Sequence, residues 1–230
     1  QMEPITDIAK KIWSEKYQFK LPDGRPIDET LDDTWRRVAR TLAAPEKEPP
    51  LAEQKFYEAL NGARFLPAGR IISGAGTERS VTLFNCFVMG EIADDMSGIF
   101  SGLREAALTM QQGGGIGYDF STLRPKGAPV LGVGADASGP LSFMNVWDSM
   151  CRTIMSAGSR RGAMMATLRC DHPDIEEFIE AKRDPMLLRM FNLSVLITDK
   201  FMEAVRTNNS WDLLFNEKIF KTISARELWT

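Results

Sequence analysis

The apolar residues in the first third of the chain recur every three or four positions, which places them on one face of a helix. The two stripes are Ile5, Ile8, Ile12 and Trp13, and Leu31, Trp35, Val38, Ala39 and Leu42. Thr6 or Asp7 can cap the first helix. A proline-rich linker, residues 44–50, precedes a short helix that stops at Gly62. The pattern predicts a helical N-terminal region over residues 1–66.

After residue 66 the pattern changes, because short apolar blocks alternate with helical stripes. The blocks that predict strands are residues 81–88, 116–120, 163–168 and 191–198. The stripes that predict helices are residues 97–110, the segments that start at Pro140 and Pro173, and residues 199–205. Strands that alternate with helices favour parallel pairing. We therefore expect an α/β fold over residues 67–230.

The end of the chain signals a helix and then stops. Ser224 and Glu227 have the spacing of a capping box, and Leu228 and Trp229 start an apolar stripe behind it. A helix much shorter than ~12 residues is marginal without packing. We interpret the stop at Thr230 as the end of a cut chain or of one part of a split protein, with a frayed terminal turn as the alternative.

The composition is that of an ordinary globular protein. The 230 residues are 43% hydrophobic and 26% charged, with a formal net charge of −3. This balance gives no global field that favours nucleic acid or an acidic membrane as a partner, and no apolar run is long enough to span a bilayer. Three cysteines without paired spacing fit a reducing cytoplasm. A single histidine, His172, leaves a metal site without support.

Three loop segments carry the residues that suggest chemistry. The glycine run 113–117 follows a helix and leads into a strand, which is the reverse of a dinucleotide fingerprint, and it lacks the Gly-Lys-Ser/Thr end of a P-loop. Its glycines either let another group approach the backbone or simply end a helix. Residues 123–129 add two cations suited to phosphate, with a solvated turn as the alternative. Residues 156–162 add Arg160 and Arg161, either as ligand contacts or as surface charge.

Cys86 lies inside the expected strand 81–88. A free cysteine is usually an inert apolar residue of a core, and Cys151, on the stripe of its helix, fits that role. We interpret Cys170 and His172 as structural too, because no third group is in place to orient them. A cysteine on a strand, a glycine turn and two arginine-bearing loops together indicate thiol chemistry beside a bound phosphate compound.

Taken together, these segments resemble the large-subunit catalytic chains of ribonucleotide reductases, specifically the adenosylcobalamin-dependent class II enzymes. The match runs from about Ile8 to the end of the chain. The motifs that carry it are residues 64–70 (RFLPAGR), 85–88 (NCFV), 113–118 (GGGIGY) with 123–127 (LRPKG), 138–144 (SGPLSFM), 160–163 (RRGA) and 171–176 (DHPDIE). Several motifs in the correct order make a far more specific signal than any one glycine pattern.

The resemblance implies a ten-stranded α/β barrel of two five-stranded halves, of which this chain supplies the preceding helices and most of the first half. It implies a ribonucleoside-diphosphate reductase that reduces ribonucleotides to deoxyribonucleotides, with adenosylcobalamin generating a cysteine thiyl radical and a thioredoxin-like or glutaredoxin-like reductant. The family's radical cysteine, its disulfide partner and its Asn-x-Cys-x-Glu loop should lie beyond Thr230. We therefore expect this chain alone to be catalytically inert and to need a missing C-terminal half or a companion chain.

The resemblance also assigns residues to a substrate site. Cys86 falls on the family's reducing cysteine, which donates an electron pair and ends in a disulfide. Asn85 and Gly115 fall where the substrate is held. Gly69 and Arg70 fall near where the substrate's phosphate is bound, although the usual serine or threonine is replaced there.

A second implied site binds a deoxynucleoside triphosphate effector, often at the interface of a homodimer. Asp94 would contact the ribose or base of the effector, and Arg124 its phosphate. The first allosteric loop is residues 126–134, with Lys126 at its start, and Leu131 within it stands where some relatives have a phosphate-binding arginine. The second loop, residues 156–164, relays effector identity to substrate choice. Its residues assigned to the effector site are Ser159, Arg160 and Arg161.

Two other interpretations stay open. One is a non-catalytic nucleotide-binding module for regulation or assembly, and the other is part of a class I enzyme whose radical comes from a separate subunit. The sequence RPKG at residues 124–127 favours the cobalamin enzymes, on resemblance alone. The main interpretation depends on the Cys86 sulfur facing a nucleotide pocket instead of filling a gap in the core.

Overall fold

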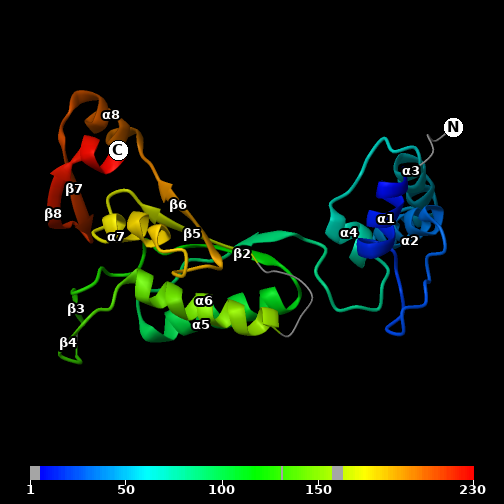
Figure 1. Ribbon diagram of the computed structural model, residues 1–230, viewed down its shortest axis with the longest axis horizontal. Coiled ribbons are helices and arrows are strands. Elements are labelled where there is room, and N and C mark those ends of the chain that lie inside the picture. The colour runs from blue at the N-terminus through cyan, green and yellow to red at the C-terminus, as the bar shows by residue number, and fades with distance from the viewer. Residues whose placement is uncertain (1–5, 131, 157–162) are drawn as a thin grey trace. The chain divides into compact units, whose positions relative to one another are not determined.

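The computed structural model describes residues 6–130, 132–156 and 163–230. The chain forms two compact units, Gln1–Asn85 and Cys86–Thr230 (Figure 1). The first unit extends beyond residue 66, where we expected the helical region to end. The reason is that the segment after residue 66 forms the helix α4 (Gly69–Gly74), and Ile72 and Ala75 join the same core as the preceding helices.

The first unit is helical, as its apolar periodicity predicts. Its other helices are α1 (Asp7–Lys16), α2 (Leu31–Ala43) and α3 (Pro49–Asn61). The hydroxyl of Thr6 caps α1, and Thr30 and Asp33 form a capping box at the start of α2. The helix α3 begins inside the segment that we interpreted as a linker, because proline is well tolerated in a first helical turn.

The stripe of α2 forms the centre of the first core, whereas that of α1 does not. Trp35, Val38 and Ala39 are buried, but Ile8 of α1 is 69% exposed. The helix α1 is instead attached through Trp13, whose indole N–H donates to the hydroxyl of Thr34 at 3.0 Å. Helical spacing therefore predicted this helix correctly but not what its apolar face contacts.

A buried ion pair that includes an arginine of α2 helps to connect this helix to the end of α4. The guanidinium of Arg37 on α2 lies 2.7 Å from the carboxylate of Asp28, and the two side chains are only 9% and 2% exposed. Arg37 also donates to the backbone carbonyls of Ile72 and Ala75, at the end of α4. A buried charge needs both a counter-charge and hydrogen bonds, and this arrangement supplies both.

The second unit is built on a four-stranded parallel sheet with the order β1-β2-β5-β6. The strands are β1 (Cys86–Val88), β2 (Gly115–Asp119), β5 (Met164–Arg169) and β6 (Phe191–Leu196). The crossovers contain α5 (Met96–Gln111), α6 (Pro140–Ser156) and α7 (Ile175–Glu180), the last followed by the 3₁₀ helix η1 (Ala181–Arg183). The predicted α/β fold, a helical N-terminal region followed by parallel strands, is confirmed.

The first strand is shorter than the expected strand 81–88. Its partner β2 begins only at Gly115, because the chain leaving α5 first turns through Gly113 at a φ of 87°. Residues 81–85 therefore have no strand to pair with and lie outside the sheet. The apolar block correctly predicted a strand here, but the length of a strand is set by its neighbour.

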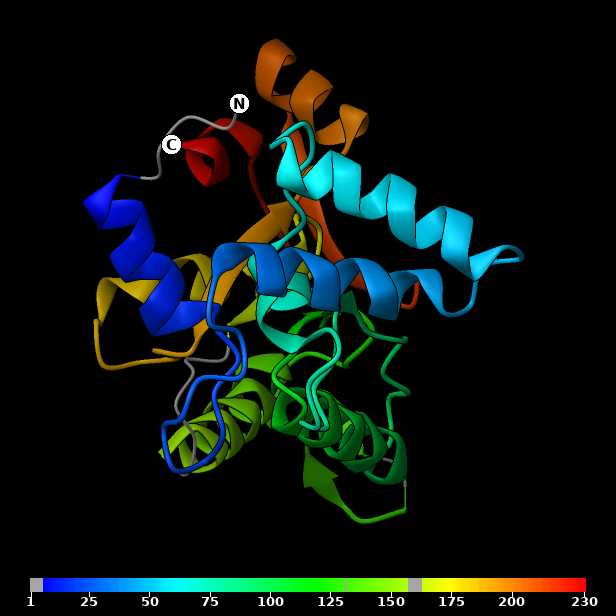
Figure 2. The same ribbon diagram turned by 90° about the vertical axis from the view of Figure 1, so that its right-hand side faces the viewer.

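Side chains alternate between two different faces of this sheet. Those of Ile116, Tyr118 and Ala166 are buried in the main core, together with Trp147 of α6. The helices α5 and α6 lie side by side along this face (Figures 1 and 2). On the opposite face, Val88 is 99% exposed.

The C-terminal part of the second unit contains a hairpin that we did not predict. It follows α8 (Asp199–Thr207) and consists of β7 (Ser210–Phe215) and β8 (Lys218–Ser224), which pair antiparallel. The turn residues Asn216 and Glu217 both have positive φ. Glutamate is an uncommon residue in such a turn, so the local signal for a hairpin is weak. One half of the predicted capping box is seen: the Ser224 hydroxyl accepts the Glu227 N–H, and α9 (Ala225–Trp229) follows.

The remaining strands form a small two-stranded sheet, β3 (Pro129–Val130) and β4 (Ala135–Asp136), between β2 and α6. No helix among the described residues has the length and apolar character needed to cross a membrane.

Candidate functional site

The cysteine at the amino end of β1 is exposed, unlike the other two. Cys86 pairs in register with Gly115, at the amino end of β2. Cys151 and Cys170 are buried, and burial raises the pKa of the Cys151 thiol to about 11 and also raises that of Cys170. The thiol of Cys86 therefore does not fill a gap in the core, and of the three it is the one open to chemistry.

The glycine turn beside Cys86 is required by a protein side chain. Strand alternation places Phe87 on the face opposite to Cys86, toward α5. A Cβ atom on Gly114 would lie 2.7 Å from the Phe87 ring and 3.0 Å from a methyl carbon of Thr109 on α5. Both interpretations of the glycine run thus hold in part: it ends a helix, and it admits a close neighbour, which at Gly114 is Phe87.

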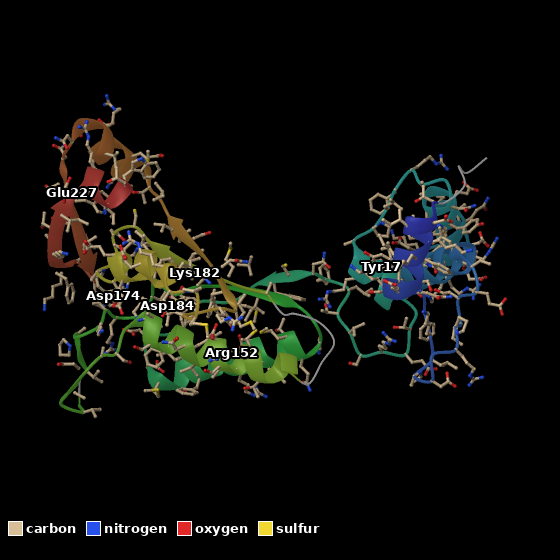
Figure 3. The ribbon with its side chains drawn as sticks, viewed as in Figure 1. Tyr17, Arg152, Asp174, Lys182, Asp184 and Glu227 are labelled. Carbon is tan, nitrogen blue, oxygen red and sulfur yellow. The ribbon has the colours of Figure 1, made fainter. Side chains whose placement is uncertain are left out.

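The other residues assigned to the substrate belong to the first unit. Asn85 is exposed and directly precedes Cys86. Gly69 and Arg70 begin α4, where a Cβ on Gly69 would lie 3.0 Å from the ring of Tyr17, labelled in Figure 3. Packing against Tyr17 accounts for the glycine at position 69, so its role in substrate binding, like those of Asn85 and Arg70, stays a prediction.

A pocket of about 350 Å³ lies at the other end of the same strands, where the chain leaves β1 and β2. It is enclosed by the start of α5, the β3–β4 hairpin and the start of α6. Its apolar lining residues include Met96, Ile99, Leu123, Val130, Val133 and Phe143. The charged residues that the structure describes at its wall are Arg124 and three aspartates, Asp94, Asp95 and Asp136. Loops at the carboxyl ends of parallel strands commonly bind ligands, and the apolar lining suits a base, with Arg124 as the one cation among the described wall residues that can face a phosphate.

Asp94 and Arg124, which we assigned to different parts of an effector, bind each other. The Arg124 Nε donates to one Asp94 carboxylate oxygen at 2.9 Å, and the Arg124 backbone N–H donates to the other at 3.0 Å. Arg124 Nη2 also donates to the Asp94 carbonyl at 2.9 Å. The guanidinium is therefore held in one orientation at the pocket wall, by a carboxylate that is 26% exposed.

Lys126 is not among the described residues that line this pocket. The ammonium of Lys126 lies 3.9 Å from a carboxylate oxygen of Glu177, on the surface. Ser159, Arg160 and Arg161 lie outside the described residues. The residue that follows this loop, Ala163, accepts the backbone N–H of Ile116 at 3.1 Å, so the loop rejoins the sheet beside the amino end of β2. The assignments of these four side chains to the effector site stay predictions.

The helix that we expected to start at Pro173 is preceded by a buried polar group, His172, which we interpreted as structural but whose hydrogen bonds we did not foresee. His172 is fully buried, with its Nε2 2.8 Å from the Leu123 carbonyl and its Nδ1 accepting the Asp174 N–H at 3.0 Å. Burial lowers the pKa of His172, which favours the neutral ring that this bonding requires. The only signal in the sequence was the motif Asp-His-Pro-Asp itself.

Two family models match the chain in the order in which its units occur. The model described as "Ribonucleotide reductase, all-alpha domain" matches residues 4–80, and "Ribonucleotide reductase, barrel domain" matches residues 84–229. The chain belongs to the ribonucleotide reductase family.

Relatives of two kinds are similar to the chain. The vitamin B12-dependent ribonucleoside-diphosphate reductase of Mycobacterium tuberculosis strain H37Rv is 40% identical over an alignment of 229 positions, and the match covers 96% of this chain and 32% of that protein. The protein of the same name from Thermoplasma acidophilum is 39% identical over 178 residues, 76% of this chain and 23% of that protein. The ribonucleoside-diphosphate reductase subunit alpha of Helicobacter pylori strain 26695 is 29% identical over 222 residues. The match covers 93% of this chain and 28% of that protein. The chain spans about a third of the length of the first two relatives it matches, both from Mycobacterium tuberculosis.

Proposed function

We propose that this chain supplies the reducing cysteine and the effector site of an adenosylcobalamin-dependent ribonucleoside-diphosphate reductase, acting in the cytoplasm. The observation that carries the proposal is the exposed Cys86 thiol opposite Gly115, at one end of two strands whose other end holds an apolar pocket with Arg124. The choice of the cobalamin enzymes is supported by the relatives, since those named for vitamin B12 are about 40% identical and the subunit alpha of Helicobacter pylori 29%.

In this proposal Cys86 is one of two thiols that reduce the substrate. The two thiols together lose two electrons and two protons and form a disulfide, while the 2′-hydroxyl of the ribose leaves as water and a hydrogen takes its place. Cys151 and Cys170 are unsuited as the second thiol because both are buried. The second thiol therefore comes from another part of the complete protein, and a thioredoxin-like or glutaredoxin-like protein reduces the disulfide afterwards.

Gly115 and Asn85 would lie against the nucleotide. A glycine at position 115 leaves the backbone beside Cys86 open, so a sugar can approach the thiol without meeting a side chain. Asn85 offers an amide that can donate to and accept from the ribose hydroxyls. Gly69 and Arg70 would bind the phosphate.

The pocket at Arg124 does not fit the cobalamin cofactor. At about 350 Å³, it has the size of a small-ligand pocket and is too small for a corrin with its nucleotide loop. When bound in the complete protein, the cofactor supplies the radical that starts the reaction.

The experiment that tests this function is a chimera. The matched region of the Mycobacterium tuberculosis relative is replaced by this chain, and deoxyribonucleotide formation is measured with adenosylcobalamin and a dithiol reductant. We expect turnover by the chimera and none by the chain alone, under the same conditions and with both ribonucleoside diphosphates and triphosphates. A folded chimera without turnover, or robust turnover by the chain alone, would contradict the proposal.

We also propose that the pocket binds a deoxynucleoside triphosphate effector, in a homodimer. The apolar lining would take the base, and Arg124 the phosphates. We expect Arg124→Ala to weaken binding about 10- to 100-fold, because one charge-assisted hydrogen bond is lost and the Asp94 carboxylate is left to repel phosphate. Isothermal titration with each of the four deoxynucleoside triphosphates measures the effect.

The matched control for Arg124 is another arginine held by a carboxylate. Arg152 lies 3.2 Å from Asp148 on α6 and is not among the pocket residues (Figure 3). Arg152→Ala should leave the affinity unchanged. Equal losses in the two variants would assign the effect to general charge and remove Arg124 from the site.

A further inference from the structure

The pocket is closed on one side by a loop whose two ends meet at one carboxylate. The loop consists of residues 126–139 and contains the β3–β4 hairpin. At its start, the backbone N–H of Lys126 donates to Asp174 Oδ2 at 3.0 Å. At its end, Gly139 approaches so closely that a Cβ there would lie 2.7 Å from the same oxygen and 3.0 Å from the Lys126 nitrogen. The carboxylate of Asp174 is labelled in Figure 3.

The position of Asp174 makes this use of its carboxylate unusual. Asp174 is the N-cap residue of α7, a position where an aspartate normally accepts an N–H of its own helix. Its side chain makes no such bond. The carboxylate is instead directed at the pocket loop, 48 residues earlier in the chain, and Asp174 as a whole is only 9% exposed.

His172 fixes the position of Asp174 relative to Leu123, which lines the pocket. One ring nitrogen accepts the Asp174 N–H, and the other lies 2.8 Å from the carbonyl of Leu123, which lines the pocket. Since the Asp174 N–H donates to one nitrogen, the neutral ring carries its own proton on the other and donates it to Leu123. Leu123, Lys126 and Gly139 are thus all positioned from residues 172–174.

We propose that Asp174 is the positioning residue of the pocket: it holds both ends of residues 126–139 so that the hairpin stays folded over the ligand. The inference rests on the proposed effector site only for the identity of the ligand. Within the loop, the Gly127 N–H donates to the Ala137 carbonyl at 2.8 Å and the Ala137 N–H to the Ala128 carbonyl at 2.7 Å. These two hydrogen bonds do not involve Asp174. Their loss in a variant at position 174 would therefore show that the whole loop has opened, and not only the contact that was removed.

The first test is amide hydrogen exchange of the chain without nucleotide. In Asp174→Ala, the amides of Lys126, Gly127 and Ala137 should all exchange at least about tenfold faster, since the ends of the loop are released. Gly139→Ala should act in the same way from the loop side, because its Cβ displaces the carboxylate. Asp174→Asn keeps an oxygen acceptor and should stay close to the wild type. Unchanged exchange at Gly127 and Ala137 in both disruptive variants would overturn the proposal.

The second test separates positioning from general stability. Affinity for the four deoxynucleoside triphosphates is measured at a urea concentration where every variant is fully folded. We expect about tenfold weaker binding for Asp174→Ala, because part of the binding energy must now order the loop, and recovery in Asp174→Asn. A matched control is Asp184→Ala, which removes another carboxylate that accepts a backbone N–H, that of Met186 at 2.8 Å (Figure 3).

The outcomes of the two tests are distinct. If the wild type binds none of the four nucleotides, the proposed effector site is wrong, and the exchange data still decide whether Asp174 holds the loop. If the wild type binds and Asp174→Ala binds equally well, or if Asp184→Ala weakens binding as much, Asp174 does not position the pocket.

Discussion

Turnover in the complete enzyme should fall to the level of an assay without enzyme when Cys86 is replaced by serine. Serine matches the shape of cysteine, but its hydroxyl cannot form a disulfide, so the electron pair needed for each reduction is missing. Cys86 is exposed on the edge strand β1, so the exchange of one atom should leave the fold intact. The measurement is deoxyribonucleotide formation by the chimera that carries this chain, with and without the substitution.

Thiol labelling provides the control for this experiment. In the native chain, Cys86 should react readily with a disulfide reagent, whereas Cys151 and Cys170 should react only after unfolding, because both are buried and burial raises the pKa of each. In Cys86→Ser the rapid reaction should disappear. If Cys86→Ser loses the rapid labelling reaction but keeps near-normal turnover, the result would favour the interpretation of the chain as a nucleotide-binding module that does no chemistry.

The second large effect concerns stability. Arg37→Ala should destabilise the first unit by about 3–5 kcal/mol, because it leaves the Asp28 carboxylate buried without its counter-charge. It also removes the donors to Ile72 and Ala75, which attach α4. Urea unfolding followed by circular dichroism measures the change.

The neighbouring arginine is the control for Arg37. Arg36 lies 2.7 Å from Asp32 on the same helix and also contacts the Tyr57 ring, but the Arg36 and Asp32 side chains are 54% and 42% exposed to solvent. Exposed pairs contribute about 0–1 kcal/mol, so Arg36→Ala should unfold close to the wild type. If the free energy of unfolding falls equally in Arg37→Ala and Arg36→Ala, the buried pair does not stabilise the first unit more than the exposed pair does.

A double variant, Arg37→Met with Asp28→Leu, should recover only part of the loss. No unpaired charge remains, but the carbonyls of Ile72 and Ala75 still lack their donor. The Phe19 N–H and the Thr34 hydroxyl also lose their acceptor.

The elements that could be predicted are those whose signal is local. The helix α2 and the strands β2, β5 and β6 follow from apolar spacing and caps, which act within a few residues. The start of β1 and the hairpin β7–β8 could not be predicted, for different reasons. The first depends on where β2 starts, and the second turns through Asn216 and Glu217 with positive φ but without a glycine.

For the candidate sites, resemblance to the family predicted single residues but not the contacts between them. Cys86 and Gly115 came from separate motifs, and their pairing in register is a property of the sheet. Asp94 and Arg124 were assigned to a ligand one by one, so their bond to each other was not expected. Asp174 was missed because its partner Lys126 is 48 residues away and the contact is made by a backbone N–H, which every residue but proline possesses.

The helix α6 is a stiff element that starts at the pocket and runs along one face of the sheet. It starts beside the pocket, where Gly139 and Phe143 contribute to the wall, and its 17 residues span roughly 25 Å. A packed helix bends little, and Trp147 at its middle is buried in the core. The first turn at the pocket and the last turn of the helix therefore belong to one rigid element. That last turn leads into the segment that rejoins the sheet at Ala163, next to the strand that carries Gly115.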